Sequence, residues 1–280
     1  MKCSLIIMVY NDIRSLSLTF ESLKIQTEKD FEVIIADDGS GPEFVSKLNA
    51  LIAEAPFKVK HIWHEDEGWR KEIIMNKAIV ASESEYLIFI DGDCIPHKRF
   101  IEEHLRFADY GKVVAGRRVM LTKEITDALT PELFASGKAH SYIFPRVLWG
   151  GLTKKVRHAE EVIRLTNGFL RHLFLNERWE GLLGCNFSMY KQDILEVNGF
   201  DERFTSPAVG EDTDLEARLN RIGIYCKVER HIATVYHKWH VMDHSGTTNV
   251  SAIFDENTAN GVSWTKYGII KGEQPVEEEE

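Results

Sequence analysis

The chain has 280 residues, of which 44% are hydrophobic and 28% are charged, and its formal net charge is −10 at pH 7. This composition indicates a globular protein with a substantial core, and the length fits one large α/β domain, alone or with an embellishment. The acidic balance argues against a nucleic-acid binder, which normally carries a basic face. Five of the negative charges are glutamates in the final EQPVEEEE, so the body is only mildly acidic.

The four cysteines and the apolar runs indicate a cellular compartment. No CxxC pair occurs, so neither a zinc knuckle nor a disulfide framework is indicated, and a reducing cytoplasm fits best. The apolar run from Leu5 to Tyr10 is too short for the core of a signal peptide. No stretch approaches the roughly 20 apolar residues that span a bilayer. We therefore expect a cytoplasmic protein, at most peripheral at the inner face of the membrane.

Strand and helix patterns alternate along the first 110 residues. Apolar runs predict four strands, at 4–10, 31–40, 58–65 and 86–90. Helical periodicity predicts helices in the segments between these strands, at 12–26, 42–54 and 69–82. This alternation predicts an α/β fold with a mostly parallel central sheet and right-handed crossovers.

The second half of the chain is less regular. We expect helices at 98–109 and 210–223, a short helix and turn at 192–202, and strands at 112–121, 181–191 and 225–240. We expect residues 122–180 to form a largely helical insertion. The part of it from 138 to 180 has a net charge of +4. Such a basic, aromatic insertion is expected to rest on an anionic membrane surface or to be a solvated helical face. A polar segment follows residue 245.

The predicted strand at 86–90 runs directly into Asp91-Gly92-Asp93. Two carboxylates one residue apart disfavour each other unless a cation lies beside them, and the glycine lets a large group approach the backbone. Such a pair suits Mg²⁺ or Mn²⁺, which binds through one or two carboxylates together with substrate phosphates. The alternative is a solvated turn, because Asp and Gly are ordinary turn formers.

Two further strand ends carry polar residues, namely Asn11-Asp12 and Asp37-Asp38. In open α/β sheets ligands collect at this edge, where the carboxyl ends of the strands meet. Asp37 and Asp38 suit the N–H of a uracil or the hydroxyls of a ribose, although ADDGS is also a common turn. The sequence contains neither GxxxxGK[ST] nor GxGxxG, so a cation would have to hold phosphate charge.

The ordered motifs MVYND, ADDGS and FIDGD resemble those of family 2 glycosyltransferases with the GT-A fold. In the second half, GCNFSMYK, NGFDE, GEDTDLEARL and VYHKWH resemble the galactosyltransferase and N-acetylgalactosaminyltransferase type, including bacterial chondroitin polymerases. The resemblance implies one Rossmann-like GT-A domain over 1–245. Its nucleotide-binding half would be 1–110 and its acceptor-binding and catalytic half 111–245, with 246–280 as a C-terminal segment.

The resemblance also implies roles at the donor site. Val9 and Tyr10 would line the base, Asp38 would accept from the uracil ring, and Asp91 would contact the ribose or the metal. The stretch EGWRKEIIMNKAI departs from the commoner pattern, because Met75-Asn76 stands where an Arg-Asn pair is usual. The cations left for base or phosphate contact are Arg70 and Lys71.

For the metal, the resemblance implies Asp93 and His237 as ligands of Mn²⁺ or Mg²⁺. His240 is the second choice to His237. A histidine at the end of a strand is otherwise a hydrogen-bonded structural residue, and this alternative stays open for both.

For the transfer itself, the resemblance implies Asp212 as the base and Glu211 as a ligand of sugar hydroxyls. The alternative is a cluster of acidic residues at a helix N-terminus, where the dipole favours them. Trp179 would form the aromatic floor of an acceptor site, or else belong to the core. Asn186, in GCNFSMYK, is assigned to the same acceptor site.

The expected activity is a metal-dependent, inverting transfer of one galactose, N-acetylgalactosamine or glucose type of sugar. The donor would be a UDP-sugar and the acceptor a saccharide or a lipid-linked saccharide, in surface polysaccharide synthesis. One alternative is a sugar-phosphate nucleotidyltransferase, whose basic Gly-rich N-terminal loop is missing from MVYNDIRS. The other is an inactive subunit that binds carbohydrate or nucleotide-sugar, against which the joint presence of Asp91, Asp93, Asp212 and His237 counts.

Overall fold

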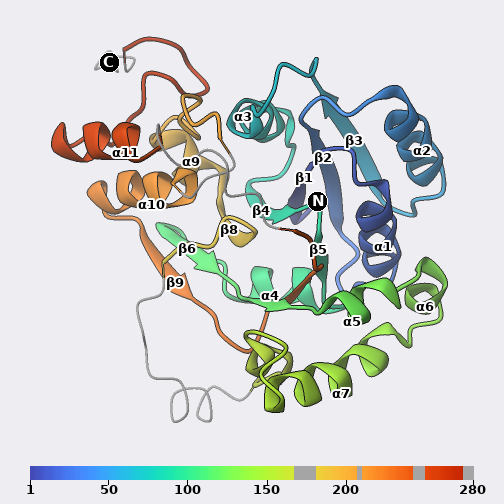
Figure 1. The fold of residues 1–280 in the computed structure, drawn as a ribbon. Coiled ribbons are helices and arrows are strands. Elements are labelled where there is room, and N and C mark those ends of the chain that lie inside the picture. The colour runs from blue at the N-terminus through green and yellow to red at the C-terminus, as the bar shows by residue number, and fades with distance from the viewer. Residues whose placement is uncertain (167–180, 207–209, 242–249, 274–280) are drawn as a thin grey trace.

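A seven-stranded sheet forms the centre of the computed structural model, which describes residues 1–166, 181–206, 210–241 and 250–273 (Figure 1). Its strand order is β3-β2-β1-β4-β8-β6-β9. In that order the strands are β3 (Lys58–Trp63), β2 (Phe31–Asp37), β1 (Cys3–Val9), β4 (Tyr86–Asp91), β8 (Asn186–Tyr190), β6 (Lys112–Ala115) and β9 (Tyr225–Val228). The first four are parallel to one another, and β8 is antiparallel to both of its neighbours. The prediction of a mostly parallel α/β sheet is therefore confirmed.

The register of the parallel strands brings their polar ends together. Val9 of β1 lies opposite Asp37 of β2, and Met8 lies opposite Asp91 of β4. All residues of β1 and β2 are buried, since helices cover both faces of the sheet, and this explains the uninterrupted apolar runs in the sequence. The residues that follow these strands consequently share one edge.

Helices cover the sheet on two faces, and successive side chains of β1 point to opposite ones. Leu5 and Ile7 pack with α1 (Ile13–Lys24), α2 (Pro42–Ala53) and α4 (Phe100–Arg106). Ile6 and Met8 pack with α3 (Lys71–Ala81), α9 (Lys191–Glu196) and α10 (Glu211–Arg221). The result is a three-layer α/β architecture.

The single strand predicted at 112–121 is wrong, because the chain changes sheets within it. After β6 it enters a second, three-stranded sheet of order β5-β10-β7, made of β5 (Cys94–Pro96), β10 (Val235–His237) and β7 (Arg118–Met120). Gly116 lies at the change, where a Cβ atom would stand 2.4 Å from Nδ2 of Asn186 and 2.7 Å from the carbonyl oxygen of Ala233. Only a residue without a side chain fits there.

The strand predicted at 225–240 divides in the same way. Its first part is β9 of the large sheet and its last part is β10 of the small one. Between them His231 and Ala233 have positive φ angles of 63° and 47°, which break the extended conformation. β10 pairs antiparallel with β5, and this brings the end of VYHKWH beside Asp93 and Cys94.

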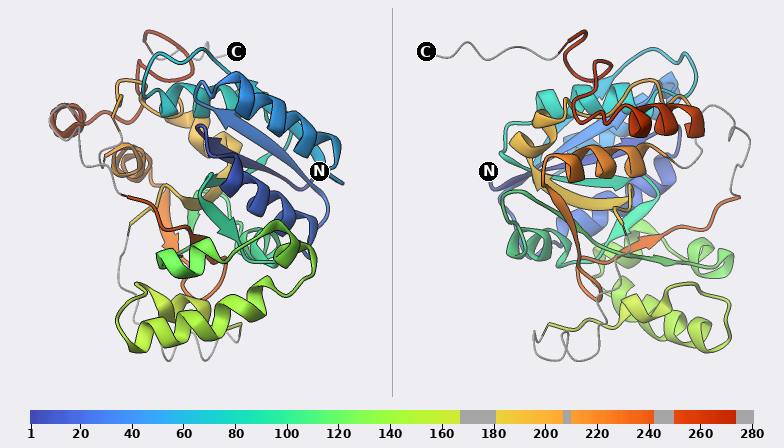
Figure 2. Two further views of the ribbon diagram at one scale, coloured as in Figure 1. Left: turned by 45° about the vertical axis from the view of Figure 1, so that its right-hand side comes forward. Right: turned by 90° about the vertical axis from the view of Figure 1, so that its left-hand side faces the viewer.

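The small sheet packs on the insertion, which lies beside the main sheet as a separate layer (Figure 2). The described part of this insertion contains α5 (Lys123–Asp127), α6 (Pro131–Ala135), α7 (Ala139–Leu152) and the 3-10 helix η1 (Ala159–Val162). The prediction of a largely helical insertion is confirmed for these residues. No helix in the described ranges has both the length and the apolar content that crossing a membrane requires.

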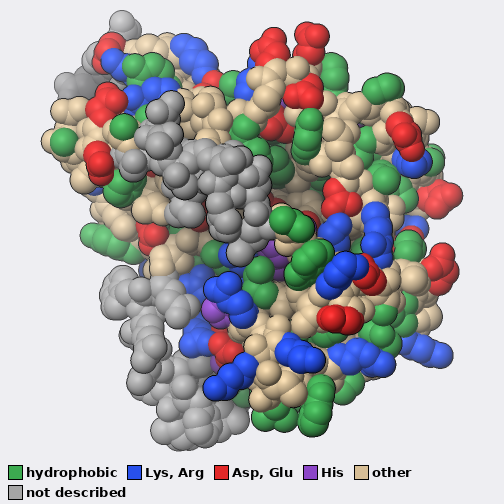
Figure 3. Space-filling view, in the orientation of Figure 1, with side chains coloured by type: hydrophobic (Ala, Val, Ile, Leu, Met, Phe, Trp, Pro, Cys, Tyr) green, Lys and Arg blue, Asp and Glu red, His purple; other side chains and the backbone are tan. Residues whose placement is uncertain are grey.

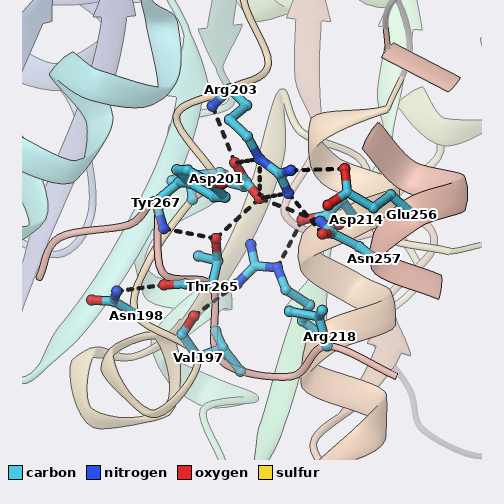
Figure 4. Close-up of polar contacts among 12 residues, drawn as sticks. Val197, Asn198, Asp201, Arg203, Asp214, Arg218, Glu256, Asn257, Thr265 and Tyr267 are labelled. Atoms are coloured by element: carbon cyan, nitrogen blue, oxygen red, sulfur yellow. Dashed lines mark hydrogen bonds and ion pairs between the residues drawn. The ribbon is translucent and has the colours of Figure 1, made fainter. Parts of the chain in front are cut away.

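The segment after residue 245 contains a helix that the sequence analysis missed, α11 (Val250–Ala259), which contacts α10. The amide of Asn257 donates to Asp201 and to Asp214, and the hydroxyl of Thr265 donates to Asp201 (Figure 4). Within α10 the buried guanidinium of Arg218 lies 2.7 Å from Oδ2 of Asp214. The described C-terminal residues therefore hold α10 from its outer side.

Candidate active site

The carboxyl edge of the large sheet gathers most of the predicted site residues, beginning with Asp38. This side chain is only 3% exposed, and its two oxygens have separate partners. Oδ1 lies 2.7 Å from Nε2 of His64, and Oδ2 accepts from the backbone N–H of Arg70 at 3.0 Å. Its neighbour Tyr10 is 49% exposed, and its hydroxyl donates to Asp66 at 2.9 Å. Asp38 is thus fixed, and the Tyr10 ring faces solvent beside it.

Lys71 connects Asp91, at the end of β4, with the N-terminus of α10. Its ammonium lies 3.2 Å from Oδ1 of Asp91 and 3.3 Å from Oε1 of Glu211. Burial alone would lower the pKa of Lys71, but the two carboxylates outweigh that effect and raise its pKa well above the usual range. Lys71 is therefore a buried cation inside the site.

Glu72, beside Lys71, is a site residue that the sequence analysis missed. It is buried, and neither carboxylate oxygen has a hydrogen-bond partner within the described residues. Burial, with the nearby charge of Glu211, raises the pKa of Glu72 well above its ordinary value, and the charge of Lys71 opposes that effect. No sequence signal distinguished it, because a Glu in the first turn of a helix is normally a solvated partner of the dipole.

Two histidines face Asp93. Oδ2 of Asp93 lies 3.4 Å from Nε2 of His237 and 3.1 Å from Nε2 of His240. The other ring nitrogen of each histidine is within hydrogen-bonding distance of a backbone carbonyl oxygen. Nδ1 of His237 lies 2.9 Å from the carbonyl oxygen of Lys238, and Nδ1 of His240 lies 3.0 Å from that of Val241. A carbonyl only accepts, so both Nδ1 atoms carry a proton, and each Nε2 can act as a ligand when it carries none.

This cluster can hold a metal ion. Ligand atoms of Asp93, Cys94 and His237 lie within 4.8 Å of one another. Without a metal ion, burial raises the pKa of the Cys94 thiol well above its usual range, which disfavours the thiolate form that binds metals. The second histidine is the better third ligand, and Asp93, His237 and His240 form a set of one carboxylate and two imidazoles.

The charges of the three side chains respond to one another. Burial favours the neutral form of Asp93, but the hydrogen bond from His240 and the charges of both histidines lower its pKa below the ordinary value. Burial lowers the pKa of His237, whereas the hydrogen bond to Asp93 raises that of His240. At neutral pH the site therefore offers an ionised carboxylate and at least one neutral imidazole.

Gly92 makes the approach of Asp93 to the histidines feasible. A Cβ atom at this position would lie 2.7 Å from the carbonyl oxygen of Met8 and 3.0 Å from Cγ1 of Val9. The turn after β4 therefore packs directly against the end of β1, where Val9 is buried. The glycine in FIDGD is required for this close passage.

Asp212 lies at the start of α10, next to Glu211. Its Oδ2 accepts from the backbone N–H of Gly184 at 3.1 Å, and its Oδ1 accepts from that of Thr213 at 2.8 Å. Each oxygen keeps a lone pair for another donor. Burial raises the pKa of Glu211, and Lys71 opposes that effect. The two carboxylates thus differ in environment, since Asp212 is held by backbone groups and Glu211 by a buried cation.

Three other predicted site residues do not join this group. Asn186 is fully buried, and its amide donates to the carbonyl oxygens of Arg117 and Ala233 and accepts from His104. Every polar group of this side chain serves the junction of the two sheets, and its assignment to the acceptor site stays a prediction. The guanidinium of Arg70 donates to Glu67 and to the carbonyl oxygen of Glu65. Trp179 lies outside the described residues.

The family model described as "Glycosyl transferase family 2" matches residues 4–195, which is more than half of the chain. The chain belongs to glycosyl transferase family 2. A second model, "N-terminal domain of galactosyltransferase", matches residues 167–242 of this glycosyltransferase. The second match includes the segments that carry Asp212 and His237.

Curated relatives agree with this family. Chondroitin synthase of Escherichia coli is 27% identical over 232 residues, covering 79% of this chain and 32% of that protein. Validoxylamine A glucosyltransferase of Streptomyces hygroscopicus subsp. jinggangensis is 27% identical over 239 residues, covering 81% and 53%. An uncharacterized glycosyltransferase of Nostoc is 36% identical over 100 residues, covering 35% and 30%. The glycosyltransferase spans about a third or less of the first relatives it matches.

Solved structures share the fold. S. aureus TarS superposes with a TM-score of 0.57 at 17% identity, covering 93% of this chain and 40% of that one. The mannosyltransferase PcManGT from Pyrobaculum calidifontis, in complex with GDP-Man and Mn²⁺, gives 0.56 at 14% identity, covering 87% and 58%. TarS 1–349 in complex with UDP-GlcNAc gives 0.54 at 17% identity, covering 93% and 67%. The fold is that of the GT-A glycosyltransferases, as the sequence motifs predicted.

Proposed function

We propose that this glycosyltransferase moves a sugar from a UDP-sugar to a hydroxyl of a saccharide or a lipid-linked saccharide, with inversion at the anomeric carbon. The observation that supports this most is the convergence of His237 and His240 on Asp93, at the edge that carries Asp38 and Asp91. The UDP-GlcNAc complex of TarS and the likeness to chondroitin synthase favour UDP and an N-acetylhexosamine or hexose donor.

In this proposal Asp93, His237 and His240 hold a divalent metal ion. Two imidazoles and one carboxylate suit Mn²⁺ better than Mg²⁺, which prefers oxygen ligands alone. When bound, the ion offsets the negative charge that develops on the departing diphosphate. The backbone carbonyls of Lys238 and Val241 fix the tautomers of the two histidines, and Gly92 lets Asp93 reach them.

The donor nucleotide lies across the ends of β1, β2 and β4 in this proposal. Asp38 binds the base, with Val9 and Tyr10 beside it, and Asp91 binds the ribose. Lys71 provides a fixed cation between Asp91 and the catalytic helix, where a diphosphate can exchange places with one of its carboxylate partners. Arg70 contributes through its backbone N–H, which holds Asp38 in place.

Asp212 is the proposed base that takes the proton of the attacking hydroxyl. The backbone N–H groups of Gly184 and Thr213 orient its carboxylate and leave lone pairs for that proton. Glu211, paired with Lys71, binds sugar hydroxyls beside it. Single displacement needs no covalent intermediate on the protein.

The test is UDP release from UDP-galactose, UDP-N-acetylgalactosamine, UDP-glucose and UDP-N-acetylglucosamine, each with Mn²⁺ and with a chelator. We expect one of the four donors to be consumed, and only in the samples that contain Mn²⁺. Asp212→Asn should slow its consumption by about 10² to 10⁴-fold without weakening UDP binding. The exposed Asp255→Asn on α11 is the matched control. Full activity of the Asp212→Asn variant would contradict the role of Asp212 as the base.

A further inference from the structure

A pocket of about 470 Å³ lies on the side of the metal-site histidines that faces the insertion. Its wall is formed by the end of β7, the start of α5, the loop that follows α7 and the segment after β10. The residues that line it are Met120, Leu121, Thr122, Lys123, Glu124, Lys155, Arg157, His237, Lys238, Trp239 and His240. Asp93 and the proposed donor residues are not among them, whereas the two histidines that face Asp93 are.

The lining is basic in an otherwise acidic protein, with four cations and a single acidic residue, Glu124. In the space-filling view, Lys and Arg side chains gather on the lower half of the visible face, with His side chains among them (Figure 3). Two of the four cations have counterions, since Lys238 lies 2.5 Å from Asp12 and Lys123 lies 2.5 Å from Asp127. The excess charge of the pocket therefore comes from the other two.

Lys155 and Arg157 are those two cations. Both are exposed, and neither forms an ion pair with a carboxylate of the described ranges. Their backbone is nonetheless held in place, because Lys155 N–H donates to Gly150 O and the carbonyl oxygen of Arg157 accepts from Met120 N–H. The two side chains thus stand on a fixed support beside the histidines, and Glu124, whose pKa the charge of Lys155 helps to lower, is the one carboxylate in the lining.

An aromatic ring completes the pocket. Trp239 is 42% exposed, and Lys123 lies 5.9 Å from the centre of its ring. An indole face in contact with solvent suits the apolar C–H face of a sugar, and adjacent cations suit an oxyanion attached to that sugar. The combination differs from the nucleotide edge, where carboxylates predominate.

We infer that this pocket binds an anionic group of the acceptor, a phosphate or a carboxylate, held by Arg157 and Lys155 with its sugar against Trp239. The inference rests on the proposed function and narrows it, because it makes the acceptor an anionic saccharide. A phosphate would come from a phosphorylated or lipid-diphosphate-linked saccharide, and a carboxylate from a uronic acid. Arg157 suits either group through its planar pair of donors.

The experiment uses the whole chain with saturating UDP and excess Mg²⁺, which replaces Mn²⁺ because Mn²⁺ is paramagnetic and broadens NMR signals, so that the donor diphosphate site is filled. Ligand-detected NMR titrations compare glycerol 1-phosphate, methyl glucuronide and the neutral methyl glucoside. We expect at least one of the two anions to bind, and the neutral sugar to bind at least tenfold more weakly. The anion that binds identifies the source of the negative charge.

The variant Lys155→Gln/Arg157→Gln should weaken binding of that anion by about tenfold or more. The control Arg106→Gln/Lys138→Gln removes two exposed cations away from the pocket and should leave anion binding unchanged. Equal anion binding in the wild type and the pocket variant would overturn the inference. So would competition between the anion and UDP, because the anion would then occupy the donor site.

Failure of the proposed function looks different. If UDP does not bind the wild type, the donor assignment fails, and the same titrations are made on the unliganded protein. Anion binding that depends on Arg157 and Lys155 would then still support the pocket. Absence of any anion binding to either form would refute it.

Discussion

Nε2 of His240 lies 3.1 Å from Oδ2 of Asp93, and the ring nitrogen on its other side is committed to the carbonyl oxygen of Val241. His237 repeats this arrangement on the same carboxylate oxygen. Lone pairs from two imidazoles and one carboxylate therefore point into the same small space, which only a proton or a metal ion makes favourable. A proton satisfies one histidine, whereas a divalent ion satisfies all three groups at once.

Replacement of either histidine should weaken metal binding. We expect His240→Ala and His237→Ala each to lower Mn²⁺ affinity by at least about tenfold, because each removes one of three protein ligands. Calorimetric titration with Mn²⁺ in the presence of UDP measures the change. If His240→Ala bound Mn²⁺ with wild-type affinity, His240 would not be a ligand, and Asp93 and His237 would remain as the ligands that the sequence analysis proposed.

Alanine at position 92 should damage the same site without touching a ligand. Gly92→Ala places a Cβ atom 2.7 Å from the carbonyl oxygen of Met8, so the turn that carries Asp93 must shift. We expect a loss of Mn²⁺ affinity of about tenfold. Gly41→Ala, at the neighbouring strand end, meets its nearest atom only at 3.8 Å and should bind Mn²⁺ normally. Equal affinity in both variants would contradict this account of the turn.

The polar contacts beneath α10 should matter for stability. Arg218→Leu leaves Asp214 buried without its cation, and breaking such a pair costs about 3–5 kcal/mol. Urea unfolding of the variant measures the loss. Lys47→Ala, which breaks the exposed pair with Glu43 on α2, should change the unfolding free energy little. A small loss in Arg218→Leu would mean that this buried ion pair within α10 contributes little to stability.

Stability should also fall in mild acid because of His104. Burial lowers the pKa of this histidine to about 4, and it contacts Ser188 and Asn186 at the junction of the sheets. Its unfolded pKa is near 6.5, so the unfolded chain binds the proton first, and stability present above pH 6.5 is lost as pH falls toward 4. The contribution is up to about 3 kcal/mol.

Urea unfolding at pH 7.5, 6.0 and 5.0 tests this pH dependence. His104→Gln should be less stable at pH 7.5 but should lose less stability between pH 7.5 and 5.0 than the wild type. Identical pH slopes in the two proteins would show that His104 already exchanges protons in the folded state near its ordinary pKa.

The sequence predicted the strands and helices of the first 110 residues well because their signals are local. The runs around Leu5, Ile34 and Ile88 are buried on both faces, and strand ends of a parallel sheet share an edge, so the proximity of Asp38 and Asp91 followed from topology alone. The pairing of Asp93 with His237 was inferred from the family resemblance, since these residues lie 144 positions apart in the sequence.

The rest depended on contacts that leave no periodic signal. Gly116 and Ala233 move the chain between sheets through close packing, which a strand pattern does not encode. Asn186 looked polar and available, yet tertiary packing buries it. Helix α11 has weak amphipathic character, and its place is set by Asn257 reaching Asp201 and Asp214 across the fold. Such residues are recognised only when their partners are known.

The most direct test of the metal-centred donor site is calorimetric titration of the protein with UDP, with and without Mn²⁺, in the wild type and in Asp93→Asn. The account predicts that UDP binds the wild type with Mn²⁺, that binding falls at least about tenfold without it, and that Asp93→Asn removes the metal dependence. UDP binding of equal strength with and without Mn²⁺, unchanged in Asp93→Asn, would contradict the role given to Asp93, His237 and His240.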